Sequence, residues 1–524
     1  LYDYIVIGSG FGGSVSALRL AEKGFRVAVL EKGRRYHTKD FPATNWNLRK
    51  FLWKPRLGLY GIQMLTLMRH VIILHGGGVG GGSLVYANQL LVPPDEVFQK
   101  QEWGPGDWKT KLMPFYELGQ RMLGATRCPT VGEADEILAE IGREIRGEDT
   151  FHINDVGVFF GEPEKTVPDP YFKGDGPERT GCSFCGACMI GCPIGAKNTL
   201  DKNYLYLAEK KYGVEIHPET EVTGVRPADA GYEVIAQKST GFRHSPKSIF
   251  ARGVVFSGGV LGTIKLLFEC KTRGLLPDIS NNLGHSVRTN SESLLTVTAN
   301  DPKADYSNHI AITSGIYPDQ KTHIEVARYN RGSDVMGSLA TILTGGGGRI
   351  PRVVRFLANI LKHPWAFLKS FWIFGWGART PILLVMQTAE NRFQFNYKRR
   401  WWRLGKKTIN SEISANSQKI PSYIPIANEV AKRMGEKING QPMSGWTEVL
   451  FDISSTAHIL GGCAMSDTAA DGVVDFTGQL HGYPNLYVVD GSNVPVNLGV
   501  NPALTITAIA EYIMSQIPEK SESS

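Results

Sequence analysis

Long hydrophobic runs free of charge are missing from this chain of 524 residues. A membrane-spanning helix needs about 20 consecutive, mainly apolar residues, so we expect no transmembrane helix. A strong excess of one charge is also missing, because the net charge is only +7, and so mild a balance does not indicate nucleic-acid binding. We see no signal peptide ahead of the apolar strand that begins at Tyr2, although an upstream segment could have been removed. These absences predict a cytoplasmic protein.

Cysteine is scarce and unevenly placed. The chain has seven cysteines, an odd number, and four of them are crowded together at Cys182, Cys185, Cys188 and Cys192. This spacing, with a proline following, matches the ferredoxin pattern, in which closely spaced thiolates bind an iron–sulfur cluster, and it favours a reducing compartment. Seven cysteines cannot ligate two full clusters, so we predict one cluster of the 4Fe–4S type, with Cys192 preferred to Cys128 as the fourth ligand. A structural zinc site or unligated thiols are the alternatives.

Acidic residues are absent between Asp334 and Glu390. The same segment is rich in Phe, Trp, Leu and Ile, and basic residues recur in it at a regular spacing: Arg355, Lys362 and Lys369. This spacing predicts one basic helix face, which Pro364 must break or kink, and such a segment suits a membrane surface. An apolar wall of a substrate tunnel is the alternative, and both can hold. The cationic aromatic run 398–403 is either an interfacial anchor or a solvated hairpin tip.

Glycine, in contrast, is abundant, with 59 residues in a chain whose 42% hydrophobic content suits a large α/β enzyme. The opening strand runs into Gly8, Gly10 and Gly13, which fit the G-x-G-x-x-G pattern of dinucleotide binding. The first allows the tight turn, the second lets the backbone approach a pyrophosphate, and the third lets the helix pack on the strand. Glu31 ends the next strand, where an acid can accept hydrogen bonds from an adenosine ribose. A glycine turn in an ordinary α/β core is the alternative.

The same pattern of a strand, a glycine turn and a helix occurs again later in the chain. We expect helices at 14–23, 133–146, 204–211, 263–270 and 504–517. We expect strands at 2–7, 25–30, 214–216, 221–225, 249–260 and 486–491. Pro502 is expected just inside the start of the last helix, where its missing N–H costs nothing.

Several motifs occur in one order along the chain: the glycine run 75–88, Ser257-Gly258-Gly259, His458-Ile459-Leu460-Gly461-Gly462-Cys463, Asp490-Gly491 and Gly499-Val500-Asn501-Pro502. With these motifs the chain resembles the glucose–methanol–choline (GMC) flavoprotein oxidoreductases, and within them the cholesterol oxidase branch. The resemblance covers nearly the whole chain and is densest at its two ends. It implies FAD rather than NAD as the cofactor.

The resemblance also implies a fold and a domain layout. The expected fold class is α/β, with a Rossmann-like FAD-binding domain built from non-contiguous segments and a substrate domain of antiparallel sheet and helices. We place the FAD-binding domain at 1–110, 203–295 and 455–524. The substrate-binding domain is then 296–454, and 111–202 is a connecting region that contains the cysteines.

The family's chemistry moves a hydride from an alcohol carbon to the flavin while a base takes the hydroxyl proton. Carried over, His458 is the active-site histidine and Asn501 its partner, and a neutral imidazole suits proton transfer near pH 7. Glu325 resembles the carboxylate that moves a steroid double bond, with a strand-edge acid paired to Arg328 as the alternative. The chain departs from the branch at Tyr86, where Asn is usual. The FAD contacts implied are Gly8, Gly10, Gly13, Glu31, Gly80, Gly82, Ser83, Asn88, Val222, Gly258, Asp490, Gly491 and Pro502.

Three functions remain open at this point. The leading one is an FAD-dependent dehydrogenase of a hydrophobic alcohol, sterol or long-chain, whose cluster passes electrons to a one-electron acceptor such as a protein or a quinone. The second is an O₂-using oxidase of the cholesterol oxidase type, with steroid isomerase activity and a merely structural cysteine site. The third is a flavin module for electron transfer or membrane interaction without alcohol turnover, against which His458 and Asn501 argue.

Overall fold

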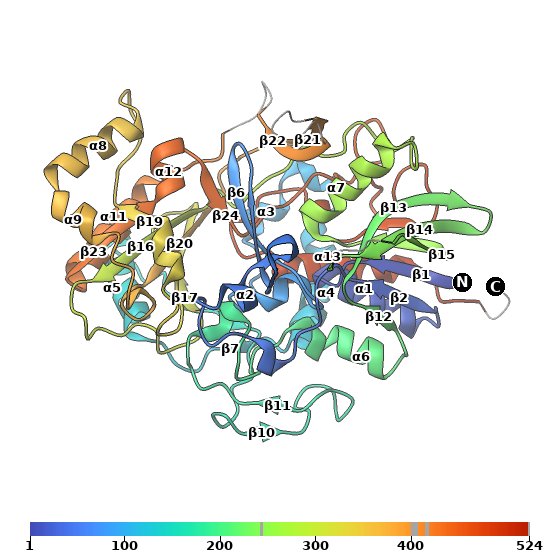
Figure 1. The fold of residues 1–524 in the computed structure, drawn as a ribbon, viewed down its shortest axis with the longest axis horizontal. Coiled ribbons are helices and arrows are strands. Elements are labelled where there is room, and N and C mark those ends of the chain that lie inside the picture. Colours follow the sequence, from blue (N-terminus) through green and yellow to red (C-terminus); the bar gives the residue numbers. More distant parts are fainter. Residues whose placement is uncertain (242–244, 400–406, 414–418, 522–524) are drawn as a thin grey trace.

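The computed structural model describes residues 1–241, 245–399, 407–413 and 419–521. Its two large sheets lie next to each other along the long axis, with both termini at one end (Figure 1). Most of the cationic aromatic run 398–403, for which an interfacial anchor and a solvated hairpin tip are the two interpretations, lies outside the described residues.

The first sheet carries the dinucleotide-type unit. It has seven strands in the order β12 (Glu215–His217), β2 (Val27–Leu30), β1 (Tyr2–Ile7), β15 (Lys247–Phe256), β14 (Gly231–Lys238) and β13 (Thr220–Ala228), with β25 (Leu486–Val488) also paired to β15. β12, β2, β1, β15 and β25 are parallel to one another, whereas β13 and β14 are antiparallel additions. β1, β2 and the second half of β15 are mainly apolar and buried, as expected when helices cover both faces of a sheet. The helices of this half are α1 (Phe11–Glu22), α4 (Trp108–Leu123), α6 (Tyr204–Lys210), α7 (Gly259–Thr272) and α13 (Ala503–Gln516).

The second sheet is antiparallel. Its seven strands run in the order β19 (Ala340–Ile342), β23 (Gly440–Gly445), β16 (Ser293–Ala299), β20 (Ile382–Gln387), β18 (Thr322–Ala327), β17 (Ile312–Ile316) and β8 (His152–Ile153). Helices α5 (Glu133–Arg146) and α11 (Pro425–Lys437) pack on it. Both α5 and β8 come from the region predicted as a connection, so part of that region builds this sheet.

A smaller, three-stranded sheet links distant parts of the chain at the site. It contains β5 (Gln63–Leu67), β6 (Val71–Gly76) and β24 (Ser454–Thr456), and β24 runs parallel to β6. β6 leads into the glycine run and β24 leads into His458, so this pairing brings the two motifs together.

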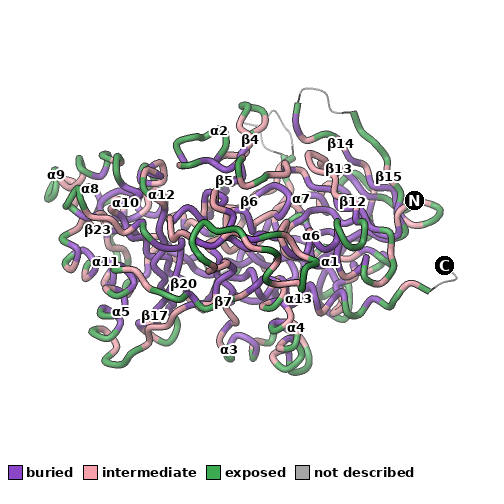
Figure 2. The backbone as a smooth tube through the Cα atoms, turned by 90° about the horizontal axis from the view of Figure 1, so that it is seen from below, coloured by how far each residue is buried: buried purple, intermediate pink, exposed green. Residues whose placement is uncertain are grey.

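The other helices and strands are short: α2 (Leu48–Phe51), α3 (Asp95–Phe98), α8 (Arg352–Lys362), α9 (Pro364–Lys369), α10 (Trp376–Arg379), α12 (Trp446–Phe451), β3 (Trp53–Lys54), β4 (Leu59–Tyr60), β7 (Thr126–Arg127), β9 (Asp155–Val156), β10 (Thr166–Val167), β11 (Arg179–Thr180), β21 (Gln394–Arg399) and β22 (Lys407–Glu412). Within the described part of the chain, every helix is too short or too polar to cross a bilayer. The sheets are largely buried, whereas α8 and α9 at one end are mostly intermediate or exposed (Figure 2).

The predicted α/β fold class is confirmed, and most predicted elements occur within a few residues of their expected bounds. Two predictions need correction. α1 begins at Phe11 rather than residue 14, because Gly12 and Gly13 are already helical. Pro502 is the N-cap of α13 and not its first helical residue. The predicted break at Pro364 is confirmed, since α8 ends before it and α9 begins at it.

Candidate functional site

Glycine-bearing segments meet at the carboxyl ends of β1, β15 and β25. A Cβ on Gly8 would lie 2.3 Å from the carbonyl oxygen of Ser257, and a Cβ on Gly12 would lie 1.9 Å from that of Val489. Only glycine allows backbones to approach so closely. A Cβ on Gly10, in contrast, would meet nothing within 4 Å, so the backbone there faces open space. In open α/β sheets this edge is where dinucleotides bind.

The start of α1 and the end of β2 complete this cradle. Gly10 is the N-cap of α1, and the free N–H groups of a helix start favour a pyrophosphate. Gly13 packs the helix on the strand as predicted, since its Cβ would lie 2.1 Å from the carbonyl oxygen of Gly8. The buried Glu31 carboxylate accepts hydrogen bonds from Ser9 N (3.1 Å), Ser9 Oγ (2.7 Å) and Gly33 N (2.7 Å). Glu31 therefore fixes the glycine turn from the position expected to face the ribose.

A second group of predicted contacts surrounds Asp490. Thr263 Oγ1 donates to Asp490 Oδ2 (2.5 Å) and accepts from Gly258 N (3.0 Å), while Ser492 N donates to Asp490 Oδ1 (2.8 Å). Burial raises the pKa of Asp490 despite these hydrogen bonds. Gly491 begins the turn that follows. This carboxylate thus joins the start of α7 to the segment after β25, next to the glycine turn of β1.

The glycine run supplies the third group. Ser83 Oγ donates to Gly80 O (2.7 Å) and accepts from Leu200 N (3.1 Å), so this hydroxyl stabilises the turn that contains Gly82. Asn88 is buried at the end of the run beside the thiol of Cys188, and among the described residues neither atom of its amide has a nitrogen or oxygen hydrogen-bond partner. A buried polar group left unpaired costs about 1–3 kcal/mol, so a bound ligand would satisfy it.

Val222 lies on β13 near Glu31. Two residues earlier, Thr220 N donates to the carbonyl oxygen of Glu31 (2.8 Å).

The glycine cradle, the buried amide of Asn88 and the start of α1 together fit FAD.

The predicted active-site histidine is held by a glutamate that sequence reasoning did not single out. Nδ1 of His458 lies 2.9 Å from Oε1 of Glu292. Thr456 Oγ1 and Ala457 N also donate to this carboxylate, at 2.7 and 2.9 Å. Burial lowers the pKa of His458, but the charge and the hydrogen bond of Glu292 outweigh it and hold that pKa above its usual value. Because Nδ1 is engaged, Nε2 is the nitrogen left for a reacting group.

Glu325 lies in the middle of the buried strand β18. Asn154 Nδ2 donates to Glu325 Oε1 (2.9 Å). Burial raises the pKa of Glu325 to about 8, although a hydrogen bond from Asn501 and the charge of His458 act in the opposite direction. The structure therefore brings Glu325, His458 and Asn501 together.

The alternative predicted for Glu325, a strand-edge acid paired with Arg328, is wrong. Arg328 Nη2 lies 2.5 Å from Asp135 Oδ2 on α5, and both side chains are buried. Glu325 has no edge position, because β18 is paired with β17 on one side and β20 on the other.

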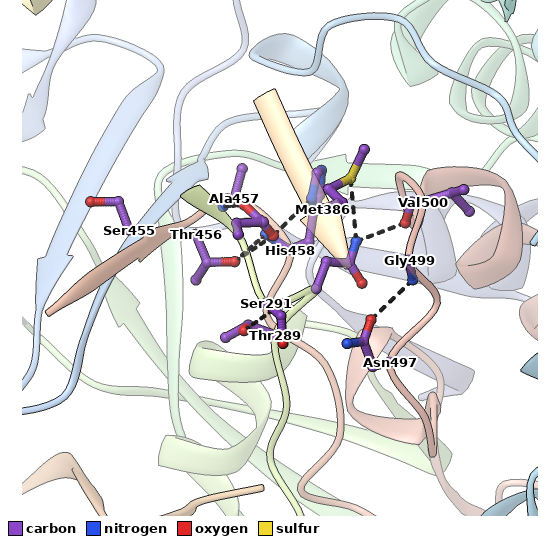
Figure 3. Close-up of polar contacts among 12 residues, drawn as sticks. Thr289, Ser291, Met386, Ser455, Thr456, Ala457, His458, Asn497, Gly499 and Val500 are labelled. Carbon is purple, nitrogen blue, oxygen red and sulfur yellow. Dashed lines mark hydrogen bonds and ion pairs between the residues drawn. The ribbon is translucent and has the colours of Figure 1, made fainter. Parts of the chain in front are cut away.

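Two asparagines hold the loop that presents Asn501 (Figure 3). Asn497 Oδ1 accepts from Gly499 N (3.0 Å), and Asn290 Nδ2 donates to Val500 O (2.7 Å). Figure 3 also shows His458 beside Thr456, whose hydroxyl oxygen accepts from the backbone N of His458 (2.9 Å). The reacting side chains thus rest on contacts from the segment before β16, from β24 and from the segment before α13.

A cavity of about 750 Å³ lies next to the strand that carries Glu325, and its lining includes Gly499 and three aromatic side chains. The rings of His323 and Tyr317 stack with centroids 4.7 Å apart, and Nε2 of His323 lies 3.1 Å from Nε2 of His152. Gly315 permits this arrangement, because a Cβ there would lie 2.4 Å from His323 Nε2. Burial lowers the pKa of both histidines, which favours neutral imidazoles.

The cysteine segment does not form a metal centre in this structure. All seven cysteines are described and free of disulfides. Burial raises the pKa of Cys182, and raises that of Cys188 to about 11, so both side chains are thiols in the metal-free protein at neutral pH. Among the described residues, no group of three or more His, Cys, Asp or Glu side chains could hold a metal ion. As arranged here these cysteines do not fit an iron–sulfur cluster, and the predicted cluster finds no support.

The same segment has a clear packing role. The buried Lys197 Nζ donates to the carbonyl oxygens of Leu84 (3.1 Å) and Cys188 (2.9 Å), and its pKa is lowered by burial to about 7. Tyr86 OH donates to Asn198 O (3.1 Å). The cysteine segment is thereby tied to the end of the glycine run.

Comparison with known proteins agrees with this geometry. Residues 6–42 match the family model described as an NAD(P)-binding Rossmann-like domain, and residues 411–510 match the one described as GMC oxidoreductase. A cholesterol oxidase of Acinetobacter baumannii is 45% identical over 99% of this chain and 95% of its own length. The chain belongs to the GMC oxidoreductase family. It lies in the cholesterol oxidase-like branch and is an FAD-dependent oxidoreductase acting on CH–OH donors, as predicted.

Other relatives of this GMC oxidoreductase support the same placement. A cholesterol oxidase of Mycobacterium tuberculosis is 46% identical over 99% of this chain and 92% of its own length. A long-chain-alcohol oxidase of Arabidopsis thaliana is 24% identical over 98% of this chain and 67% of its own length. Among solved structures, pyridoxine 4-oxidase from Mesorbium loti shares the fold with a TM-score of 0.64, at 16% identity and with 98% of both chains covered.

Proposed function

We propose that this enzyme oxidises the hydroxyl group of a sterol or a related hydrophobic alcohol with O₂ as the acceptor, and then moves the double bond of the steroid product. The observation that carries the proposal is the meeting of His458, Asn501 and Glu325 at one site, with Glu292 behind the imidazole. The names of the relatives support the substrate class and the acceptor. In this proposal, the third FAD-binding segment contributes His458 and the substrate-binding domain contributes Glu325.

The oxidation step uses the imidazole as a base. FAD, when bound, accepts the hydride from the alcohol carbon. Glu292 holds the proton on Nδ1 of His458, so the lone pair of Nε2 takes the hydroxyl proton, and the nearby carboxylate stabilises the imidazolium that results. Asn501 donates one amide N–H to Glu325, and its second N–H can donate to the oxygen of the substrate hydroxyl and position it.

The second step belongs to Glu325. Its carboxylate removes a proton from the carbon between the new ketone and the double bond, and returns that proton at the far end of the double bond. The raised pKa of about 8 makes this carboxylate a stronger base than an ordinary glutamate. Asn154 orients it from β8's side of the sheet.

The Glu325→Gln variant tests the proposal. We expect isomerisation to fall by on the order of a hundredfold or more, while oxidation of the hydroxyl falls by less than about tenfold. Because only the carboxylate acts as a base, isomerisation by the wild type should rise as the pH increases through about 8. Product analysis separates the unmoved ketone from the conjugated one.

Glu448→Gln is the matched control, because Glu448 on α12 is also a fully buried glutamate, with a pKa raised by burial to about 7. This variant should not separate the two reactions. Isomerisation at the wild-type rate in Glu325→Gln, or an equal loss of both reactions, would overturn the proposed role.

A one-electron route through an iron–sulfur cluster, which the cysteine spacing predicts, stays a prediction. Iron analysis of anaerobically purified protein tests it directly.

A further inference from the structure

Helix α8 has two apolar sides. Its inner side is packed, because Phe356 is 2% exposed and stacks edge-on against Trp446 with ring centroids 5.7 Å apart. Its outer side is apolar as well, since Leu357 is 56% and Leu361 83% exposed. A surface helix of a globular protein normally has one apolar stripe. Within the described residues, no part of the chain covers Leu357 and Leu361 on the outer side of α8.

The outer side of α8 continues onto α9 and the turn after it. These side chains, which we call the α8–α9 face, are each more than half exposed: Leu357, Leu361, Trp365, Leu368, Phe371 and Trp372. Phe374 extends the face by stacking on Trp46, with ring centroids 6.0 Å apart. Large contiguous apolar patches are rare on monomeric soluble proteins and mark interaction sites. The face lies at the end of the molecule opposite the termini (Figure 1).

Charge identifies the kind of partner. The chain has no acidic residue between Asp334 and Glu390, whereas the exposed Lys362 and Lys369 flank the apolar side chains. Tryptophan, other apolar side chains and lysine on one short amphipathic element are typical of segments that lie in the interface of a bilayer. A second copy of this chain fits less well, because a two-fold contact would bring the same lysines together.

We propose that the α8–α9 face docks on the surface of a lipid bilayer that contains anionic lipids. The apolar side chains enter the boundary between headgroups and acyl chains, and the lysines contact the anionic headgroups. The inference deepens the proposed function, because sterols and long-chain alcohols reside in bilayers.

The face is joined firmly to the catalytic region. Arg352, at the start of α8, donates to the carbonyl oxygens of Thr344 (3.1 Å) and Ser422 (2.6 Å). Its guanidinium also lies 3.9 Å from the buried carboxylate of Glu448 on α12. The chain runs from α12 into β24 and on to His458. A bilayer bound at this face is therefore held in a fixed relation to the site.

Sedimentation with vesicles tests the proposal. We expect the FAD-loaded enzyme to bind vesicles of phosphatidylcholine with phosphatidylglycerol, and Leu361→Ser combined with Trp365→Ser to weaken binding by on the order of tenfold or more. Lys362→Glu combined with Lys369→Glu should remove the preference for the anionic lipid. Phe250→Ser is the matched control, because Phe250 is 47% exposed on β15 in the other half of the molecule, and it should bind as the wild type does.

Activity separates this inference from the proposed function. The Leu361/Trp365 double variant should oxidise a sterol in detergent micelles at the wild-type rate, but a sterol in vesicles more slowly. Undiminished vesicle binding by this variant would overturn the inference. The inference would also be overturned if the wild type formed a dimer that did not bind vesicles and the double variant were monomeric. The face would then join two copies of this chain. If the wild type bound vesicles but oxidised no sterol in micelles, the proposed function would be wrong and the docking of the α8–α9 face would still hold.

Discussion

At the scale of single residues, the decisive contact joins His458 to Glu292. The carboxylate lies 2.9 Å from Nδ1 and is itself held by the hydroxyl of Thr456 and the N–H of Ala457. An anion fixed behind an imidazole does two things: it orients the ring, and it makes the opposite nitrogen more basic.

Removing that anion should therefore change the pH dependence of oxidation. The active form of His458 is the neutral one, so wild-type activity rises as the pH increases through the raised pKa of His458. In Glu292→Gln that pKa should fall, so the rise in activity should move to lower pH. The plateau of kcat/KM should drop by on the order of tenfold or more because the base is weaker.

His458→Ala should lower kcat/KM for oxidation by on the order of a hundredfold or more while FAD stays bound.

The measurement is a kcat/KM profile against pH, with flavin content checked by absorbance. Glu390→Gln, at an exposed glutamate, is the control and should leave the profile in place. An unchanged profile in Glu292→Gln would show that the ion pair does not set the basicity of the histidine.

Sequence alone predicts part of this site. His458 and Asn501 stand in short local motifs, so the resemblance finds them. Glu292 stands in no motif and is 165 residues away from Ala457, whose N–H it accepts. Asn154 is 171 residues from Glu325. Such partners meet only when the second sheet folds, and no local pattern encodes that meeting. His323 and Glu325 are two positions apart in one strand, so the sequence places both polar side chains on the same face of the sheet, and this pattern indicates a site there.

At the scale of elements, the glycine turn couples α1 to β25 as well as to β1. The motif predicts the turn, but it does not reveal that Gly12 also contacts the segment after β25. Gly10 and Gly12 therefore have different roles. A Cβ on Gly12 would lie 1.9 Å from the carbonyl oxygen of Val489, whereas a Cβ on Gly10 would have no atom within 4 Å.

Gly10→Ala and Gly12→Ala should consequently behave differently. Gly10 has a φ of −72°, which any residue adopts, so Gly10→Ala should keep the Tm of the apoprotein but weaken FAD binding by on the order of tenfold, because the methyl group enters the cofactor's space. Gly12→Ala should lower both, because α1 must shift away from β25. Thermal unfolding of apoprotein and titration with FAD measure the two effects. Wild-type FAD affinity in Gly10→Ala would contradict this assignment of the cradle.

At the scale of the whole molecule, sequence patterns predict the α/β class and the order of the motifs, because glycine turns and apolar strands are local features. They predict less well how the segments assemble. The connecting region supplies β8 and α5 to the second sheet, since their apolar faces find partners only there. The cysteine spacing predicts a cluster, yet burial and Lys197 arrange these residues as packing around the glycine run.

The destination of the electrons is a property of the whole molecule, because it depends on the flavin site and on the cysteine segment together. The most direct measurement is the amount of hydrogen peroxide formed per sterol oxidised by protein whose flavin and iron contents are known. We predict one peroxide for each hydroxyl oxidised, in protein that contains FAD and no stoichiometric iron. Rapid reduction of one-electron dyes without peroxide, in protein with several irons per flavin, would contradict it and return the cysteines to an electron-transfer role.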